Sequence, residues 1–140
     1  MNTCKFRAAV GVAVAGLGLL AAPALARADP VTECQLTTAN QGETGQCLQD
    51  TLGAAEAALA LALQRAQIKA DATDQATGRT GARPALDQAQ QAWTSFRDLN
   101  CQVPAALAAG GSGADQFSTG CQIELTRART DELDRWASKP

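Results

Sequence analysis

Four cysteines are the residues of this sequence best suited to chemistry. Cys34, Cys47, Cys101 and Cys121 follow an apolar N-terminal run, and a fifth, Cys4, precedes it. Thiols form disulfides in oxidising compartments or bind metal ions. A metal site is disfavoured because the chain has no histidine and no C-x-x-C pair. We therefore predict two disulfides; three pairings are open, and we favour Cys34–Cys47 with Cys101–Cys121, since each closes a short loop.

Other catalytic groupings are hard to assemble from this composition. Without histidine or tyrosine, the chain cannot form a Ser–His or Cys–His nucleophile pair. The GGSG run at residues 110–113 lacks the lysine of a phosphate-binding loop. Asp98 and Glu124 could form a carboxylate pair of the kind that glycosidases use, but an alanine-rich helical hairpin offers no substrate cleft. We predict a protein without catalytic activity, cofactor or metal.

The N-terminus has the pattern of a cleavable secretory signal. Two basic residues precede an uncharged run at residues 8–22, and small residues then allow cleavage after Ala26 or Ala28. The run is shorter than the ~20 residues that a membrane-spanning helix needs, and no cysteine directly follows the cleavage site to carry a lipid. We predict a signal at residues 1–28 and a mature domain at 29–140, secreted or periplasmic, with no lipid anchor and no membrane span.

Cleavage would change the charge balance of the chain. From residue 29 onward there are 9 basic and 14 acidic residues, a net charge of −5. A nucleic-acid-binding protein would carry a basic face instead. The acidic balance favours solubility and is compatible with a basic partner.

The spacing of apolar residues predicts an all-α fold, a small disulfide-stapled bundle of about three helices with a long antiparallel hairpin. We expect helices at about residues 44–70, 84–101 and 121–136, because apolar positions recur there at steps of three and four. A short helical turn is expected near Cys34, and glycine-containing polar segments at 71–83 and 102–120 are predicted loops. The positions predicted to face the core are Leu48, Leu52, Ala55, Leu59, Leu63, Ala66, Leu86, Ala89, Trp93, Phe96, Asn100, Cys121, Leu125, Ala128 and Leu133.

Three motifs resemble those of the LprI-like lysozyme inhibitor domain, a family of bacterial envelope proteins. Residues 89–101, AQQAWTSFRDLNC, resemble its AQ-x-AW-x-x-(F/Y)RD-x-x-C signature. GGS at 110–112 is similar to the family's loop, and residues 121–133 are similar to its C-x-x-x-x-T-x-x-R-x-x-E-L helix. The first helix departs from the family, because residues 59–63 lack the asparagine and tyrosine of its LN-x-x-(Y/L) pattern.

The resemblance implies a protein that binds lysozyme and protects peptidoglycan; the alternative is a general envelope-binding or structural module without lysozyme activity. Arg97 is expected to bond either the carbonyls at its helix end or a carboxylate of the last helix. The matched residues are expected to be mainly scaffold: Gln90, Trp93, Phe96, Arg97, Asp98, Thr126, Arg129 and Leu133.

For contact with a partner we single out the loop between Cys101 and Cys121. An aromatic side chain there could anchor an interface, although Phe117 could instead cover the core beside Cys121. The candidate contact residues are Ser112, Asp115, Gln116 and Phe117.

Overall fold

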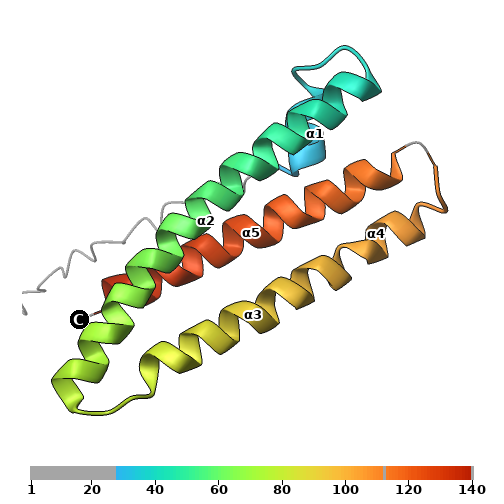
Figure 1. Ribbon diagram of the computed structural model, residues 1–140. Helices are drawn as coiled ribbons and strands as arrows, with labels where there is room; N and C mark the ends of the chain where they lie inside the picture. Colours follow the sequence, from blue (N-terminus) through green and yellow to red (C-terminus); the bar gives the residue numbers. More distant parts are fainter. Residues whose placement is uncertain (1–27, 112, 140) are drawn as a thin grey trace, which may run out of the picture.

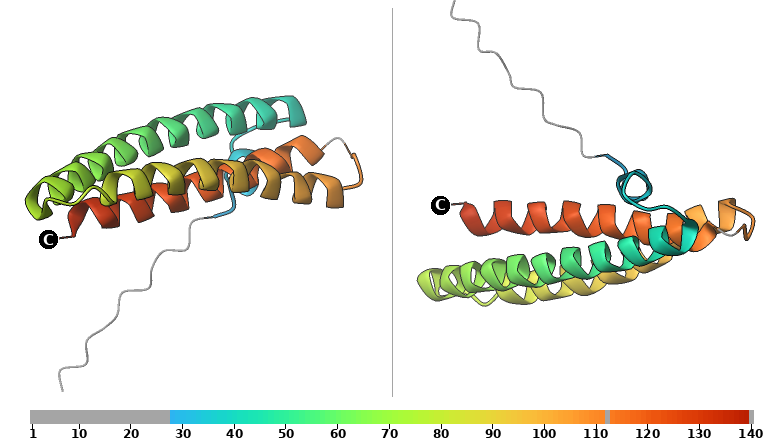
Figure 2. Two further views of the ribbon diagram at one scale, coloured as in Figure 1. Left: turned by 60° about the horizontal axis from the view of Figure 1, so that its bottom comes forward. Right: turned by 90° about the horizontal axis from the view of Figure 1, so that it is seen from above.

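The computed structural model describes residues 28–111 and 113–139, and the signal predicted at residues 1–28 lies almost wholly outside that part. The described chain forms five helices and no strand (Figure 1). They are α1 (Pro30–Gln35), α2 (Gln41–Thr77), α3 (Ala82–Asn100), α4 (Gln102–Leu107) and α5 (Ala114–Ser138). α2, α5 and the nearly continuous pair α3–α4 lie side by side as an elongated bundle (Figure 2). The predicted all-α class is confirmed.

The helices alternate in direction along the chain. α2 and α3 form the predicted antiparallel hairpin, whereas α2 and α5 run parallel and pack against each other along their length (Figure 1). Gln116 Nε2 donates to the backbone carbonyl of Gln41 at the start of both helices, at 2.9 Å. Near their ends, Arg65 Nη2 lies 2.6 Å from Asp134 Oδ1. The most extensive helix–helix contact is therefore between two parallel helices, α2 and α5. α3 packs against them and runs in the opposite direction.

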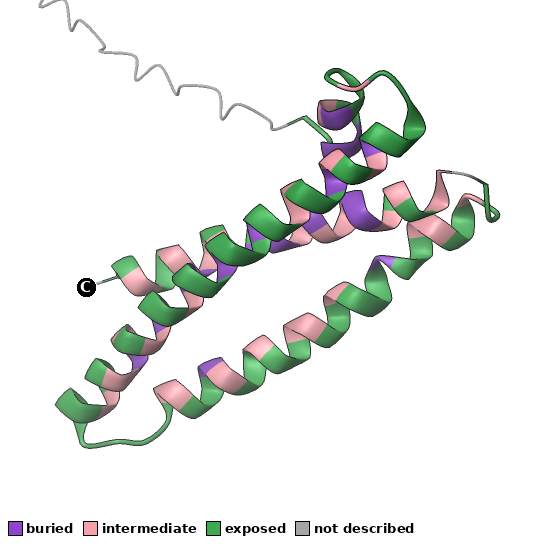
Figure 3. Ribbon diagram, turned by 45° about the horizontal axis from the view of Figure 1, so that its top comes forward, coloured by how far each residue is buried: buried purple, intermediate pink, exposed green. Residues whose placement is uncertain are grey.

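Two apolar clusters fill the space between the helices, and half of the buried residues of the larger one are alanines. Figure 3 shows the buried residues along the facing sides of α2 and α5. Alanines let these two helices approach closely, so each buried residue contributes little apolar area. One cluster contains Val31, Cys34, Leu48 and Ile123, and the other contains Leu59, Ala62, Ala66, Ala70, Leu86 and Leu133.

Both predicted loops are mostly helical, which corrects the sequence prediction. α2 continues through the first to Thr77 and ends at Gly78, whose φ of 67° is a left-handed helix cap. The second contains α4 and the first turns of α5. The polar side chains of these segments face solvent. Their sequence therefore lacks the apolar repeat by which a helix is predicted, although the segments are helical.

Several predicted core positions are exposed, because α3 contributes only one narrow face to the core. Phe96 is 53% exposed, and Ala89, Asn100 and Ala128 are also exposed. Trp93 is partly buried against the larger cluster. Leu52, Leu63, Cys121 and Leu125 are only partly buried. Of the positions predicted to be core on α5, Leu133 is buried; the other buried residues of this helix are Thr119, Gly120, Ile123, Thr126 and Arg129.

The tight turn between α2 and α3 is held by the carboxylate of Asp74. It accepts hydrogen bonds from the backbone N–H groups of Gly81, Ala82 and Arg83 at 3.0, 2.9 and 3.0 Å. These donors belong to the start of α3 and have no partner within their own helix. The three bonds, that from Arg83 foremost, lower the pKa of the Asp74 carboxyl below its ordinary value of 3.8.

We expect Asp74→Asn to lower the melting temperature by a few degrees at neutral pH. Because the pKa of Asp74 is lower in the folded chain than in the unfolded one, its stabilisation is present above the ordinary pKa and is lost as the pH falls through the folded value. The difference in melting temperature between the variant and the native protein should therefore become smaller as the pH falls. Thermal unfolding followed by circular dichroism from about pH 7 to about pH 2 measures it. A gap that stays constant over this range would contradict the capping role; Asp50→Asn, at an exposed helix position, is the control.

Candidate functional site

Two disulfides join the helices at one end of the bundle, here called the stapled end. Cys34–Cys47 ties α1 to α2, and Cys101–Cys121 ties the junction of α3 and α4 to α5. The favoured pairing is thus confirmed. The staples leave α1, α4 and the turn at 108–111 grouped at this end of the molecule (Figure 1).

Three of the family-motif residues, Trp93, Arg97 and Arg129, meet between α3 and α5 and form with Trp136 a group here called the arginine–tryptophan cluster. The guanidinium groups of Arg97 and Arg129 lie 5.4 and 5.9 Å from the ring centroid of Trp93. Arg129 also lies 5.0 Å from the ring of Trp136. At these distances the ring faces attract the cations. The cluster therefore binds α3 to α5 where few apolar residues do so.

Arg97 connects three helices within this cluster. Its Nη1 donates to Glu56 Oε1 of α2 at 3.1 Å and to Thr126 Oγ1 of α5 at 3.2 Å. Its Nε donates to the neighbouring Asp98 at 3.0 Å. We expected a carboxylate of the last helix or the carbonyls at the helix end, so the partner on α2 is a correction. The fully buried Thr126 hydroxyl is the contribution of the last helix.

Arg129 is the most buried charge of the described chain, with 6% of its surface exposed. Its Nε donates to Gln90 Oε1 at 3.1 Å and its Nη1 to Glu132 Oε2 at 2.6 Å. Its Nη2 is buried and has no hydrogen-bond partner. Buried charges require such pairing to persist. The buried Arg129 therefore helps to hold α3 and α5 together. This position is consistent with the scaffold role expected for the motif.

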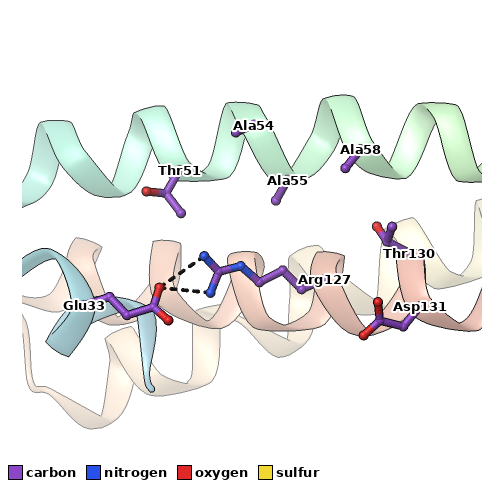
Figure 4. Close-up of a pocket in the computed structure, with 8 residues that line it drawn as sticks. All are labelled: Glu33, Thr51, Ala54, Ala55, Ala58, Arg127, Thr130 and Asp131. Atoms are coloured by element: carbon purple, nitrogen blue, oxygen red, sulfur yellow. Dashed lines mark hydrogen bonds and ion pairs between the residues drawn. The ribbon is translucent and has the colours of Figure 1, made fainter. Parts of the chain in front are cut away.

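An open groove of about 360 Å³ lies between α2 and α5 beside α1 (Figure 4). Its one ion pair, Arg127 with Glu33 at 3.1 Å, bridges α5 to α1. The remaining wall on α2 is made mainly of alanine methyl groups, as Figure 4 shows. The groove therefore presents a neutralised ion pair and short side chains, with few polar groups converging on one point.

The two carboxylates considered as a catalytic pair have separate surroundings. Asp98 bonds Arg97 on α3, whereas Glu124 lines a shallow depression on α5 with Arg127 and Asp131. Over residues 28–111 and 113–139, no group of three His, Cys, Asp or Glu residues could hold a metal ion. In the same part of the chain no helix is both long and apolar enough to cross a membrane.

The residues singled out for partner contact have different environments. Ser112 lies outside the described residues. Gln116 is tied to Gln41 of α2, which makes it part of the scaffold. Asp115 and Phe117 are exposed in the first turn of α5, rather than at a loop tip, and Phe117 retains 49% of its surface. Across the turn, Leu107 at the end of α4 is 81% exposed, a residue that our sequence analysis missed because it expected no helix there.

Charge is distributed unevenly along the bundle. The half that carries the disulfides, residues 28–58 and 94–127, has eight acidic and two basic residues, a net charge of −6. The other half, residues 59–93 and 128–139, has seven basic and six acidic residues, a net charge of +1. The exposed side chains of Leu107 and Phe117 therefore belong to the acidic half of the bundle. An apolar patch within an acidic field is suited to a basic protein partner.

The fold and the two disulfides define a small, disulfide-stapled helical-bundle protein. The family described as "Lysozyme inhibitor LprI" matches residues 33–133, and the chain belongs to this family. It is also 35% identical over 117 residues to an uncharacterized protein, R02472, of Rhizobium meliloti (strain 1021), which covers 80% of this chain and 83% of that protein. No solved structure gives a significant match.

Proposed function

We propose that this protein is exported and inhibits lysozyme by binding it with the stapled end. The family match carries the proposal, and the acidic, partly apolar character of that end supports it. Animal lysozyme is strongly basic, so a half-molecule of charge −6 would increase the rate of association by electrostatic steering.

Within the stapled end, Phe117 and Leu107 are the proposed anchors. Both are large and exposed; Leu107 directly precedes the turn at 108–111, and Phe117 lies in the first turn of α5. Aromatic side chains that enter a pocket contribute most to the binding energy of an interface. Asp115, two residues before Phe117, would meet a basic rim. Such an inhibitor needs only to cover the substrate cleft of lysozyme, so it requires no reactive group of its own.

The expected result is that the mature chain slows lysis of Gram-positive cells by C-type lysozyme, and that Asp115→Ala/Phe117→Ala raises the half-inhibitory concentration by about 30-fold, the loss of one strong anchor. Ile68→Ala/Asp131→Ala is the matched control, because it removes an exposed apolar side chain and an exposed acid from outside this patch.

Two outcomes would oppose the proposal. If lysis is unchanged at a several-fold excess of the native chain, the protein does not inhibit that class of lysozyme. This result would favour a general envelope-binding module. Full inhibition by a folded Asp115→Ala/Phe117→Ala variant would retain the inhibitor but place its contact surface elsewhere.

A further inference from the structure

The outer face of α3 and α4 carries an exposed apolar stripe with a heptad repeat, here called the outer seam. Its three large members, Phe96, Leu99 and Val103, are 53%, 65% and 52% exposed. The steps along it alternate between four and three residues, which is the spacing of a helix that packs against another helix in a coiled coil. The outer seam consists of Ala85, Ala89, Ala92, Phe96, Leu99, Val103 and Ala106, all exposed.

The outer seam is continuous across the junction of the two helices. Cys101, between them, has helical backbone angles and its N–H donates to the Arg97 carbonyl at 3.0 Å, an α-helical bond. Residues 82–107 therefore form a nearly continuous rod of about 39 Å at 1.5 Å per residue. Figure 3 shows exposed surface along the outer side of this rod.

The flanks of the outer seam carry no charge. On one side lie Gln88, Ser95 and Gln102, all exposed and uncharged, and on the other side Leu86 and Trp93 turn into the bundle itself. A basic partner would find no carboxylate beside this stripe, unlike at the stapled end. The outer seam therefore suits a partner that is recognised by its shape. The glutamine amides on its flank can form hydrogen bonds with similar groups of that partner.

The outer seam is complementary to itself when two copies run antiparallel. In that arrangement Phe96 faces Ala92 of a second copy, Leu99 faces its Ala89, and Val103 faces its Ala85. Each large side chain then meets a small one at every layer, which fills space evenly. A parallel pairing would set large against large at one end and alanine against alanine at the other.

The charge distribution favours the same orientation. An antiparallel pair places the half of charge −6 beside the +1 half of the other copy, whereas a parallel pair would place the two acidic halves together. A strip about 39 Å long and about 10 Å wide covers about 400 Å² of each copy. The total of about 800 Å² is below the roughly 1,200 Å² at which stable interfaces begin, so we expect a weak, reversible pair.

We propose that the outer seam is a self-association surface on which a second copy packs antiparallel, related to the first by a two-fold axis. The two stapled ends then lie at opposite ends of the dimer. Self-association does not depend on lysozyme binding, so it is tested separately. If the proposed function also holds, one dimer presents two binding ends.

Sedimentation equilibrium of the mature chain tests the dimer. The weight-average mass should rise from monomer toward dimer with concentration, and Leu99→Glu should weaken dimerisation at least about tenfold, because it places a charge against Ala89 of the second copy. Leu61→Glu, at a 57% exposed site on α2, is the matched control and should dimerise like the native chain. A native chain that stays monomeric up to about 1 mM, above the dissociation constant of even a weak pair, or a Leu99→Glu variant that dimerises normally, would overturn the proposal.

Cross-linking tests the orientation. In the antiparallel register Ser95 faces Ser95 of the second copy, whereas Gln88 faces Gln102. A short bismaleimide should therefore join Ser95→Cys chains to each other but join Gln88→Cys chains only when Gln102→Cys chains are mixed with them. The four native cysteines described above are in disulfides and do not react. Equal cross-linking of Ser95→Cys and Gln88→Cys alone would indicate parallel pairing and overturn the antiparallel dimer.

Discussion

Replacing all four disulfide cysteines by alanine should leave the domain largely unfolded at room temperature. The two bridges span 13 and 20 residues of chain, and closing loops of these lengths stabilises a fold by about 3 kcal/mol each. Domains of this size have about 5–15 kcal/mol in total. The core here is alanine-rich, so the apolar surface that would compensate is small.

The two bridges should not be equivalent. Cys101–Cys121 closes the longer loop and fastens the α3–α4 rod, in which Leu86 is the one buried residue of α3. Cys34–Cys47 fastens only the short α1. We expect Cys101→Ala/Cys121→Ala to lower the melting temperature by about 15 °C and Cys34→Ala/Cys47→Ala by less. Circular dichroism at increasing temperature measures both, and a reversed order would show that α1 is the more important fastening.

Features that depend on neighbouring residues could be predicted from the sequence. The long apolar stripe of α2 needs only the helical repeat, and both disulfides close short loops, so each is specified within a few turns of chain. The helical parts of residues 71–83 and 102–120 could not be predicted this way. Their polar side chains carry no periodic signal, and α3 is begun by a carboxylate of the preceding helix, Asp74.

Contacts between distant segments were not visible in the sequence. One of the two carboxylates that pair with Arg97 is Glu56, 41 residues earlier on another helix. Gly120 was assigned to the end of a loop, but it is buried in α5, where an added Cβ would lie 2.8 Å from Val31 Cγ2 of α1. Such a glycine marks a close approach that only the packed structure shows.

Phe96 illustrates why the core face of α3 was misassigned. The helix has two apolar stripes, one with Leu86 and Trp93 and the other, the outer seam, with Phe96 and Leu99. Both have helical spacing, and residue type alone favoured burial of the large aromatic ring. Which stripe turns inward is set by α2 and α5, because the arginine–tryptophan cluster fixes Trp93 between Arg97 and Arg129.

Removing the guanidinium group of Arg129, at the centre of the arginine–tryptophan cluster, should lower the free energy of unfolding more than any other single substitution proposed here. Arg129→Ala leaves the partly buried Gln90 amide oxygen without its donor and removes the stacking on Trp93 and Trp136. The lost hydrogen bonds, the cation–π contacts and the packing of the buried Arg129 stem together contribute about 3 kcal/mol. Arg127→Ala, two residues earlier on the same helix, removes a more exposed ion pair to Glu33 and should cost less than about 1 kcal/mol.

Arg129→Lys distinguishes planar stacking from charge alone. A lysine ammonium group lacks the flat shape of a guanidinium group, so it cannot stack between the two tryptophan rings and also donate hydrogen bonds in two directions. The free energy of unfolding of Arg129→Lys should therefore remain well below that of the native chain. The readout is tryptophan fluorescence, because Trp93 and Trp136 are the two tryptophans of the sequence and both contact Arg129. If the motif is scaffold, folded Arg129→Lys still inhibits lysozyme at low temperature. Loss of inhibition with native-like fluorescence and stability would instead place Arg129 in the contact surface, which its burial opposes.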